Sequence, residues 1–226
     1  MSTLTIPPVI AIDGPVASGK SSLARRLARH FGFDHLNTGL LYRAVGLGLH
    51  RAGLTHENIN EAVAIAAALT QADLEDEALT SAEAGQMASK VAGVMPVREA
   101  LIDFQRNFCQ TPPNGRGAVL DGRDITTFIW PQAPVRLFVT ASADARASRR
   151  EAEIAEKQRN GLLSGGEPVT HAAVLADISA RDARDAANTP YNLRIAPGAY
   201  VLDNTLLDLS ATLAAAVLYA TPKLQS

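Results

Sequence analysis

Residues 9–21 read Val9-Ile10-Ala11-Ile12-Asp13-Gly14-Pro15-Val16-Ala17-Ser18-Gly19-Lys20-Ser21. The apolar run at the start is typical of a buried strand, and the stretch from Gly14 to Ser21 has the spacing of a phosphate-binding P-loop. The glycines let such a loop curl so that successive backbone N–H groups point at an anion. Lys20 can then reach the terminal phosphates, and the Ser21 hydroxyl can ligate Mg²⁺. We therefore predict a strand, a nucleotide-binding loop and a helix in that order.

The residues after the loop have the pattern of a helix. Leu23, Leu27 and Phe31 recur at helical spacing, and Gly32 follows where a left-handed C-terminal cap is expected. A glycine-containing turn that merely joins two elements is the alternative reading of the loop. The order of strand, loop and helix favours the P-loop, with the helix beginning at the phosphates.

Composition limits the class of protein. The chain has 226 residues, 47% of them hydrophobic, which suits one α/β domain carrying insertions. The formal net charge of −2 argues against DNA or RNA as a partner, because such partners select strongly basic surfaces. Only four of the 21 basic residues are lysines. An excess of arginine suits phosphate binding, but a GC-rich genome would also produce it.

Cysteine and histidine give no sign of a disulfide or a metal cluster. Cys109 is the single cysteine, and no secretory segment or membrane-length apolar run is visible, so we expect a cytoplasmic protein. The five histidines have no ligand-like spacing. A Ser-His-Asp triad remains open, although no nucleophile-elbow motif recommends one.

Short apolar runs alternate with helical patterns, which is typical of a parallel sheet flanked by helices. We expect strands at about Val9–Asp13, His35–Leu36, Ala118–Asp121, Val135–Thr140 and Tyr200–Leu202. Every candidate motif falls at the carboxyl end of one of these strands, where open α/β sheets bind ligands. The fold class predicted is an α/β P-loop kinase with a five-stranded parallel sheet, its single domain spanning residues 1–226.

A long helical block separates the second and third strands. We predict a helix capped by Thr38, an alanine-rich helix at about Glu61–Thr70, a helix opened by a capping box at Thr80–Glu83, and a helix that starts at Pro96. The block is too long for one crossover connection. We therefore expect residues 54–96 to form a movable insertion on the substrate side.

A second insertion is expected at about residues 150–185. Charged residues from Arg149 to Arg159 lead into the glycine-rich stretch Gly161–Gly166 and then into a helix carrying Arg181 and Asp185. One interpretation is a solvated pair of helices with a flexible tip. The other is a lid that folds arginines over nucleotide phosphates and excludes water.

One further motif, Leu120-Asp121-Gly122-Arg123-Asp124, ends the third strand with two acids flanking an arginine. It occurs together with Asn37-Thr38-Gly39-Leu40-Leu41-Tyr42-Arg43, Val97-Arg98-Glu99-Ala100, Pro131-Gln132-Ala133-Pro134-Val135 and Arg181-Asp182-Ala183-Arg184-Asp185. With these motifs in this order, the chain resembles the bacterial cytidylate kinases, a family of nucleoside monophosphate kinases. The resemblance runs from about Ile10 to Leu202.

The resemblance implies transfer of the γ-phosphoryl group of ATP to CMP or dCMP, with Mg²⁺, in a monomer that binds neither nucleic acid nor membranes. It implies ATP binding by Gly14, Pro15, Val16, Ala17, Ser18, Gly19, Lys20, Ser21 and Ser22, and a Mg²⁺ ligand in Ser21. It implies cytosine binding by Ser89, Arg98 and Asp124, acceptor-phosphate binding by Thr38, Tyr42, Arg43 and Arg123, and ribose binding by Asp185. Catalytic roles fall to Lys20, Arg123 and Arg181.

Elementary chemistry agrees with these roles. The N4 amino group of cytosine is a donor that a carboxylate accepts, whereas uracil has an acceptor oxygen at that position, so Asp124 should select cytosine. Arg98 can donate to the acceptor edge of the ring. Phosphoryl transfer needs in-line positioning and cations at the developing charge, and the acceptor phosphate is already anionic, so no catalytic histidine is expected. Other roles remain open: Tyr42 as a buried packing residue, Arg98 as a surface residue in the first turn of a helix, and Ser89 as a serine on a helix face.

Two departures from the family pattern stand out. Asn188 occupies a position where the family normally carries a lid arginine, and Arg194 is a hypothetical replacement for the lost charge. The insertion before Ser81 is shorter than in well-known members and lacks their strand-rich part. Asp13 and Asp121 are both candidates to orient the waters of Mg²⁺.

Other functions are still open from the sequence. A P-loop kinase acting on UMP or shikimate would share the loop, and a domain that binds nucleotide without turnover would share most of the site. A GTPase switch would need an Asn-Lys-x-Asp motif, which is absent, and a motor ATPase usually has Asp-Glu where this chain has Asp121-Gly122.

Overall fold

A computed structural model describes residues 6–160 and 169–225. Its centre is a five-stranded parallel sheet in the order β2-β3-β1-β4-β5. The strands are β1 (Val9–Asp13), β2 (Asp34–Asn37), β3 (Ala118–Gly122), β4 (Val135–Thr140) and β5 (Tyr200–Asp203). All five predicted strands are confirmed to within two residues at each end, as is the parallel α/β class.

The register of the sheet brings the polar motifs to one edge. Strand β1 is buried along its whole length, as expected for the central strand of a sheet covered on both faces. Its last residue, Asp13, pairs with Gly122 of β3, and Asn37 of β2 pairs with Asp121. The carboxyl ends of the strands therefore deliver the candidate residues side by side.

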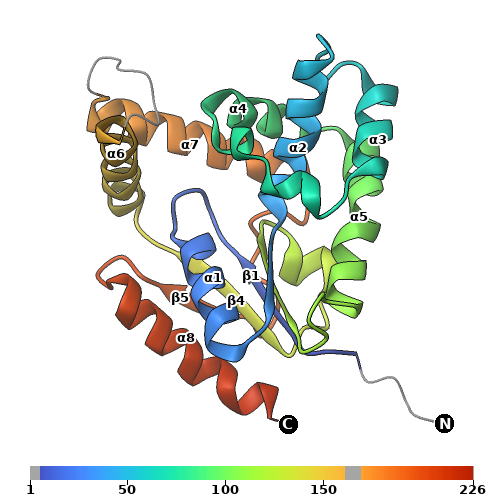
Figure 1. Ribbon diagram of the computed structural model, residues 1–226. Coiled ribbons are helices and arrows are strands. Elements are labelled where there is room, and N and C mark those ends of the chain that lie inside the picture. Colours follow the sequence, from blue (N-terminus) through green and yellow to red (C-terminus); the bar gives the residue numbers. More distant parts are fainter. Residues whose placement is uncertain (1–5, 161–168, 226) are drawn as a thin grey trace, which may run out of the picture.

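Helices cover both faces of the sheet (Figure 1). On one face lie α1 (Lys20–Phe31) and α8 (Leu209–Leu224), where Leu23 and Leu27 pack against Ile10, Ile12 and Leu137. On the other face lie α5 (Met95–Gln110) and the π-helical turn η3 (Ile125–Ile129), in a cluster with the fully buried thiol of Cys109. Alternating apolar residues on the strands supply both cores.

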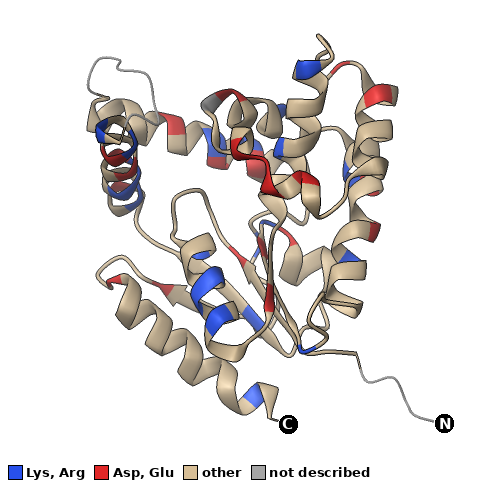
Figure 2. Cartoon of the chain, viewed as in Figure 1, with Lys and Arg blue, Asp and Glu red and all other residues tan. Residues whose placement is uncertain are grey.

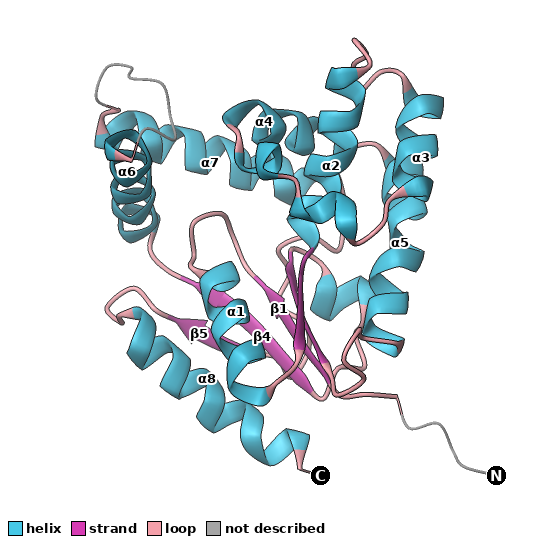
Figure 3. Ribbon diagram, in the orientation of Figure 1, coloured by secondary structure: helices cyan, strands magenta, loops and turns pink. Residues whose placement is uncertain are grey.

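The block between β2 and β3 is helical in the part of the chain that the structure describes, and it lies beyond the carboxyl edge of the sheet (Figure 3). It consists of α2 (Thr38–Arg51), α3 (Ile59–Ala68), the 3₁₀ turns η1 (Ala72–Glu75) and η2 (Glu77–Thr80), α4 (Ala82–Val91) and the start of α5. Leu41, Val45, Leu49 and Leu101 form its core. The expectation of a helical insertion without strands is confirmed.

Helices α6 (Ala143–Arg159) and α7 (His171–Asn188) form the second insertion and pack against each other. Ala147, Val174 and Ile178 make a small core, against which Val16 and Ala17 of the P-loop pack. The predicted glycine-rich tip at Gly161–Gly166 falls outside the described residues. Across residues 6–160 and 169–225, no helix combines the length and apolarity needed to cross a membrane.

Two helix starts differ from the prediction. Asn37, not Thr38, caps α2, because its side chain accepts the backbone N–H of Gly39. Ser81, not Thr80, caps α4 by accepting the N–H of Ala84, so the expected capping box is not formed. In each case the cap lies one residue from the prediction, where two adjacent polar residues compete for the role.

Gly46 marks a close approach between α2 and α4, because a Cβ built on it would lie 2.7 Å from the Cβ of Met87. We expect Gly46→Ala to lower the free energy of unfolding by about 1–3 kcal/mol, the usual cost of overpacking a rigid contact. Gly48→Ala, on the same helix α2, is the matched control, since its Cβ would meet only the side chain of Ile65 on α3. Urea denaturation of both variants measures the difference. Equal stabilities would contradict the close-packing argument.

Candidate nucleotide-binding cleft

A cleft of about 780 Å³ lies between the carboxyl edge of the sheet and the two helical insertions. Residues from α1, the β2–α2 junction, α4, α5, the end of β3, α6 and α7 line it. All eight residues expected to bind the acceptor nucleotide line this one cleft: Thr38, Tyr42, Arg43, Ser89, Arg98, Arg123, Asp124 and Asp185. Residues up to 147 positions apart in the sequence are thus brought together.

The P-loop has the curled backbone that its sequence predicts. Ala17 and Gly19 adopt positive φ angles of 56° and 82°, and α1 begins at Lys20. The ammonium group of Lys20 folds back to donate to the carbonyl of Pro15 at 3.1 Å. Burial, and next the repulsion by Arg123, lower the pKa of Lys20 to about 7.

Three of the residues predicted to bind ATP belong to the P-loop but do not line the cleft. Val16, Ala17, Gly19, Lys20, Ser21 and Ser22 line the cleft, whereas Gly14, Pro15 and Ser18 do not. A Cβ on Gly14 would lie 2.1 Å from the carbonyl oxygen of Val139, so only glycine lets the loop leave the sheet at this point. The carbonyl of Ser18 accepts from Asn204 at 2.9 Å.

The second insertion grips the P-loop directly. The backbone N–H of Val16 donates to Asp182 of α7 at 3.1 Å. Arg146 of α6 donates both to Asp182, at 2.5 Å, and to the carbonyl of Val16, at 3.0 Å. The sequence did not identify this contact, which joins three elements through one buried guanidinium.

A chain of polar side chains stands behind Ser21. Its hydroxyl donates to the buried carboxylate of Asp121, whose other oxygen lies 2.8 Å from Nε2 of His35. Burial alone would raise the pKa of Asp121, but the hydrogen bond from His35 and its charge bring that pKa below its ordinary value. An ionised carboxylate therefore faces the Ser21 hydroxyl.

Asp13 has a different role. Its carboxylate is fully buried and accepts from the backbone N–H groups of Ile125 and Thr126, at 2.8 Å and 2.7 Å, and from the Thr126 hydroxyl at 2.5 Å. Burial raises its pKa to about 6. Of the two acids considered for the waters of a metal, Asp13 is occupied by the turn after Asp124, and Asp121 is the one in contact with Ser21.

Positive charge is concentrated in the cleft although the whole chain has a net charge of −2. The lining includes eight Lys and Arg side chains and only five Asp and Glu side chains. Figure 2 shows basic and acidic residues mixed along α6, which borders the cleft with Arg149, Arg150 and Glu153. Such a surplus of cations around a cleft fits a polyanionic ligand.

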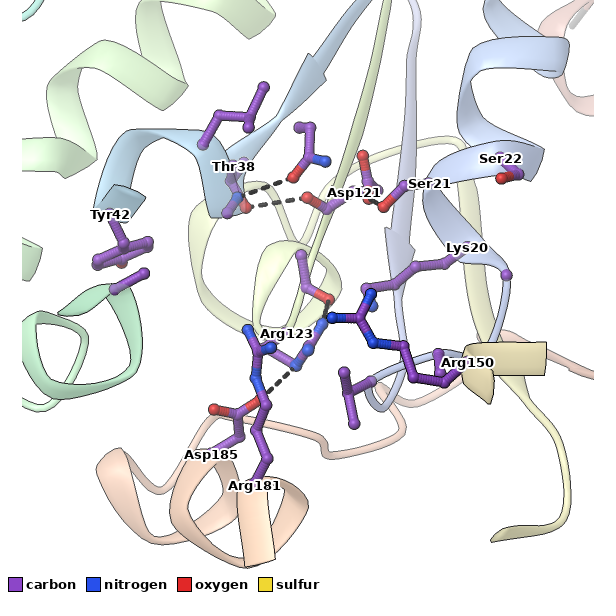
Figure 4. Close-up of a pocket in the computed structure, with 18 of the residues that line it drawn as sticks. Lys20, Ser21, Ser22, Thr38, Tyr42, Asp121, Arg123, Arg150, Arg181 and Asp185 are labelled. Atoms are coloured by element: carbon purple, nitrogen blue, oxygen red, sulfur yellow. Dashed lines mark hydrogen bonds and ion pairs between the residues drawn. The ribbon is translucent and has the colours of Figure 1, made fainter. Parts of the chain in front are cut away.

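The cations meet at the end of β3. Figure 4 shows Arg123, Arg150 and Arg181 pointing toward one another from β3, α6 and α7. Arg123 Nε donates to Asp185 at 2.8 Å, whereas Nε of Arg181 is buried and has no hydrogen-bond partner among residues 6–160 and 169–225. Burial and repulsion by Arg123 lower the pKa of Arg181. Phosphate oxygens of a ligand would give these three arginines anionic hydrogen-bond acceptors.

Arg194 is exposed and does not line the cleft. Arg150 does line it, and sequence reasoning did not assign Arg150 to the site. Arg150, rather than Arg194, is therefore placed to supply the charge that is missing at Asn188. The paired arginines at 149 and 150 inside the predicted lid were the available signal.

The other end of the cleft is uncharged overall and more enclosed. Arg98 and Asp124 form a buried ion pair there, and the guanidinium lies over the ring of Tyr42 at 5.7 Å from its centroid. Burial raises the pKa of Asp124, and Arg98 opposes that rise. Ser89 and Asn188 line the same cleft, and within the described part of the chain Ser89 Oγ and Asn188 Nδ2 are buried without hydrogen-bond partners. These atoms leave a donor and a hydroxyl for a polar ligand.

Thr38 and Arg43 also make structural contacts. The Thr38 hydroxyl donates to the carbonyl of Asp121 at 2.9 Å, which ties the β2–α2 junction to β3. Arg43 donates to the carbonyls of Leu79 and Ser81, at 2.6 Å and 3.1 Å, and so joins α2 to the start of α4. Both residues still line the cleft.

A third part of the cleft was missed from the sequence. It lies beside the P-loop, where Arg149 donates to the side chain and carbonyl of Asn204 at 2.8 Å and 2.6 Å. Leu207, Leu209 and Thr212 complete this part. No local motif marks these residues, because they come together only when the turn between β5 and α8 meets α6 through Arg149 and Asn204.

Comparison with known proteins identifies the relatives of this chain. Residues 10–221 match the family model described as cytidylate kinase. A cytidylate kinase from Paramagnetospirillum magneticum is 50% identical over 209 residues, which cover 92% of this chain and 95% of that protein. A cytidylate kinase from Rhodopseudomonas palustris (strain BisA53) is 48% identical, with 92% and 94% covered.

Solved structures support the fold. A crystal structure of an uncharacterized protein from Eubacterium ventriosum aligns with a TM-score of 0.53 and 14% sequence identity. The alignment covers 95% of this chain and 98% of that one. At this identity the likeness concerns the fold alone.

The P-loop geometry makes a prediction for Lys20. We expect Lys20→Met to weaken binding of a non-hydrolysable nucleoside triphosphate by about 10- to 100-fold, the value of a charged hydrogen bond to phosphate. The thermal midpoint without ligand should not fall, because the variant removes a buried cation that Arg123 and Arg181 repel. Isothermal titration calorimetry measures the affinity, and differential scanning calorimetry measures the thermal midpoint. Lys90→Met, at an exposed position, is the matched control, and equal affinity of the two variants would contradict the assignment.

Proposed function

Because this chain belongs to the cytidylate kinase family, and so is an ATP-dependent kinase that phosphorylates CMP or dCMP, we propose a role for each part of its cleft. The P-loop end binds the triphosphate of ATP, and the enclosed end between α4, α5 and α7 binds the pyrimidine nucleotide. The observation that carries the assignment is the buried Arg98–Asp124 pair at one end of a cleft whose other end is the P-loop.

The enclosed end suits cytosine. The carboxylate of Asp124 accepts from the N4 amino group, and Arg98 donates to the acceptor edge of the ring. Ser89 and the unpartnered amide of Asn188 face the same space and can bond the remaining polar atoms of the nucleotide. Asp185, held by Arg123 at 2.8 Å, binds the ribose. The ring of Tyr42 packs against the guanidinium of Arg98. This contact favours a positioning role for Tyr42 over direct phosphate binding.

Phosphoryl transfer then follows from position and charge. An oxygen of the acceptor phosphate attacks the γ-phosphorus, the new O–P bond forms as the bond to the β-phosphate oxygen breaks, and the electron pair leaves with ADP. Lys20, Arg123 and Arg181 lie around this point and stabilise the negative charge on the equatorial oxygens. Arg150 is a further cation for the same charge. The acceptor oxygen is anionic near neutral pH, so no side chain needs to remove a proton.

The donor set of the site suits Mg²⁺. Among the cleft residues, Ser21 offers a hydroxyl backed by the ionised Asp121, and within the described residues no group of three His, Cys, Asp or Glu side chains could hold a metal ion. Mg²⁺ commonly binds through few protein ligands, with phosphates and waters completing its shell. We propose Ser21 as the direct ligand and Asp121 as the acceptor for bound water. When bound, the ion neutralises charge on the β- and γ-phosphate oxygens.

We propose that residues 54–96 act as the insertion that binds the monophosphate and residues 150–185 as the lid. Ser89 on α4 and Arg181 on α7 support this division, because each insertion supplies the cleft with side chains from its own helices. One chain supplies both nucleotide sites, so we propose that the enzyme works as a monomer. We further propose that it works in the cytoplasm, where nucleotide pools are held.

A coupled assay with CMP, dCMP, UMP, AMP and shikimate at one ATP concentration tests the proposal as a whole. We expect kcat/KM for CMP and dCMP to exceed the value for UMP by at least about 100-fold, because a site built for hydrogen bonding leaves its groups unpaired with the wrong base. Comparable values for UMP would contradict base reading by Asp124. Shikimate or AMP in first place would overturn the placement of the nucleotide.

The raised pKa of Asp124 makes the choice of base depend on pH. As pH falls, Asp124 takes up a proton at a higher pH than an ordinary aspartate would. The protonated carboxyl accepts from N4 more weakly, because it has lost its charge, and its O–H can donate to the uracil oxygen. We therefore expect the CMP-to-UMP ratio of kcat/KM to fall on acidification. The ratio cancels titration of the substrate phosphate, which both nucleotides share.

Asp124→Asn is the control for this profile. The variant should show a low ratio that no longer changes with pH, while losing less of its activity with UMP than with CMP. A wild-type ratio that stays constant from pH 8 to pH 5, or a ratio in the variant that still varies, would contradict the role of the Asp124 charge.

A further inference from the structure

Asn192 lies in the turn between α7 and β5 and is deeply buried, with 5% of its surface exposed. The turn is fixed to the rest of the molecule at several points. The N–H of Leu193 donates to the carbonyl of Arg123 at 2.8 Å, and the Thr127 hydroxyl donates to the carbonyl of Tyr191 at 2.9 Å. Tyr191 also stacks on Phe128 with ring centroids 4.7 Å apart. Asn192 is therefore held in a defined position at the wall of the cleft.

The side chain of Asn192 joins the two charged pairs of the nucleotide site. Its Oδ1 accepts from Nη2 of Arg98 at 3.3 Å and from the Thr189 hydroxyl at 3.1 Å. Its Nδ2 donates to the backbone carbonyl of Asp185 at 2.7 Å. Only this orientation of the amide pairs every contact, because the reverse would set the NH₂ group against Arg98 and the oxygen against a carbonyl. One neutral side chain thus connects the base end with the helix that carries Asp185.

The need for this contact arises when a base enters. Before that, Asp124 is the charged partner of Arg98, and Nη1 donates to the carbonyl of Ala92 at 3.2 Å. When a cytosine amino group donates to Asp124, it competes with Arg98 for the acceptor positions of that carboxylate. Asn192 Oδ1 then remains as an acceptor for Nη2, so the guanidinium keeps its orientation while it donates to the ring.

A neutral amide is suited to this position. A second carboxylate next to Arg98 would compete with Asp124 for the guanidinium and would face the carbonyl of Asp185 with an unpaired oxygen. An apolar residue would leave one N–H of a nearly buried guanidinium without an acceptor. Asn supplies an acceptor on one side and a donor on the other.

We propose that Asn192 is a positioning residue for cytosine selection, which holds Arg98 in the plane of the base and links it to the Asp185 helix. This inference rests on the proposed function, since it assumes that Arg98 and Asp124 read the base. Asn192 acts through Arg98 and is not itself a catalytic residue.

The test compares Asn192→Leu and Asn192→Asp with wild type, using CMP and UMP as substrates. We expect Asn192→Leu to lower the CMP-to-UMP ratio of kcat/KM about tenfold, mainly through a higher KM for CMP, with kcat and the KM for ATP within about twofold. Asn192→Asp keeps an acceptor for Arg98 but loses the donor to the Asp185 carbonyl and competes with Asp124, so its ratio should fall below wild type and stay above that of Asn192→Leu. Equal losses with CMP and UMP in Asn192→Leu would overturn the proposal.

Two controls separate positioning from general damage. Thr127→Val removes an anchor of the same turn without touching Arg98, and should leave the CMP-to-UMP ratio unchanged. In an Arg98→Met background, Asn192→Leu should cause no further loss of the ratio, because its effect passes through Arg98. An additive loss in that background would overturn the proposal. If Asn192→Leu does not fold, as thermal melting would show, Asn192→Ala takes its place in both comparisons.

The outcomes also distinguish this inference from the function on which it rests. Wild type and Asp124→Asn are measured in parallel. A wild type without preference for CMP would overturn the proposed function itself. A wild type that prefers CMP, loses that preference in Asp124→Asn and keeps it in Asn192→Leu would overturn the role of Asn192 alone.

Discussion

The buried carboxylate of Asp13 fixes the turn on which the whole cleft depends. Strand β1 delivers Asp13 to the carboxyl edge of the sheet, and its three hydrogen bonds to Ile125 and Thr126 hold the chain just after Asp124. Arg123 and Asp124 are consecutive, yet Arg123 pairs with Asp185 of α7 and Asp124 pairs with Arg98 of α5. The two side chains can diverge in this way only if the backbone between them is rigid. The cost of burying an acid is offset by two backbone donors and one hydroxyl that would otherwise lack partners.

The charged residues around that turn include two ion pairs that line the cleft. Arg98 with Asp124 and Arg123 with Asp185 are nearly neutral units, while Lys20, Arg150 and Arg181 contribute the surplus of positive charge. The hydrogen bonds of Arg146 and Asp182 to Val16 keep α7 against the P-loop, so cations of the second insertion line the cleft. Repulsion among them is tolerated because the helices that carry them have cores of their own.

Local patterns in the sequence were sufficient for the fold and for most of the residues assigned to the site. The strands were predictable because their apolar runs are short and bounded by turn residues, and the P-loop because glycine spacing constrains backbone geometry. Helix starts were less certain, as Asn37 and Ser81 show, since adjacent polar residues have similar capping energies. Arg146, Asn192 and Asn204 could not be found, because their roles come from partners 36 to 186 positions away. The comparisons identify the family, whereas the roles of individual cleft residues remain proposals.

Cys109 has a practical consequence. Its thiol lies on the buried side of α5, and burial raises its pKa to about 12, so it stays protonated and shielded from alkylating reagents at neutral pH. With no other cysteine in the sequence, a thiol introduced on an exposed face of α3 or α7 would be the one site open to maleimide chemistry. The natural chain is therefore ready for spin labels or fluorophores, and the distance between its two helical insertions can be followed through a reaction cycle without first removing a native thiol.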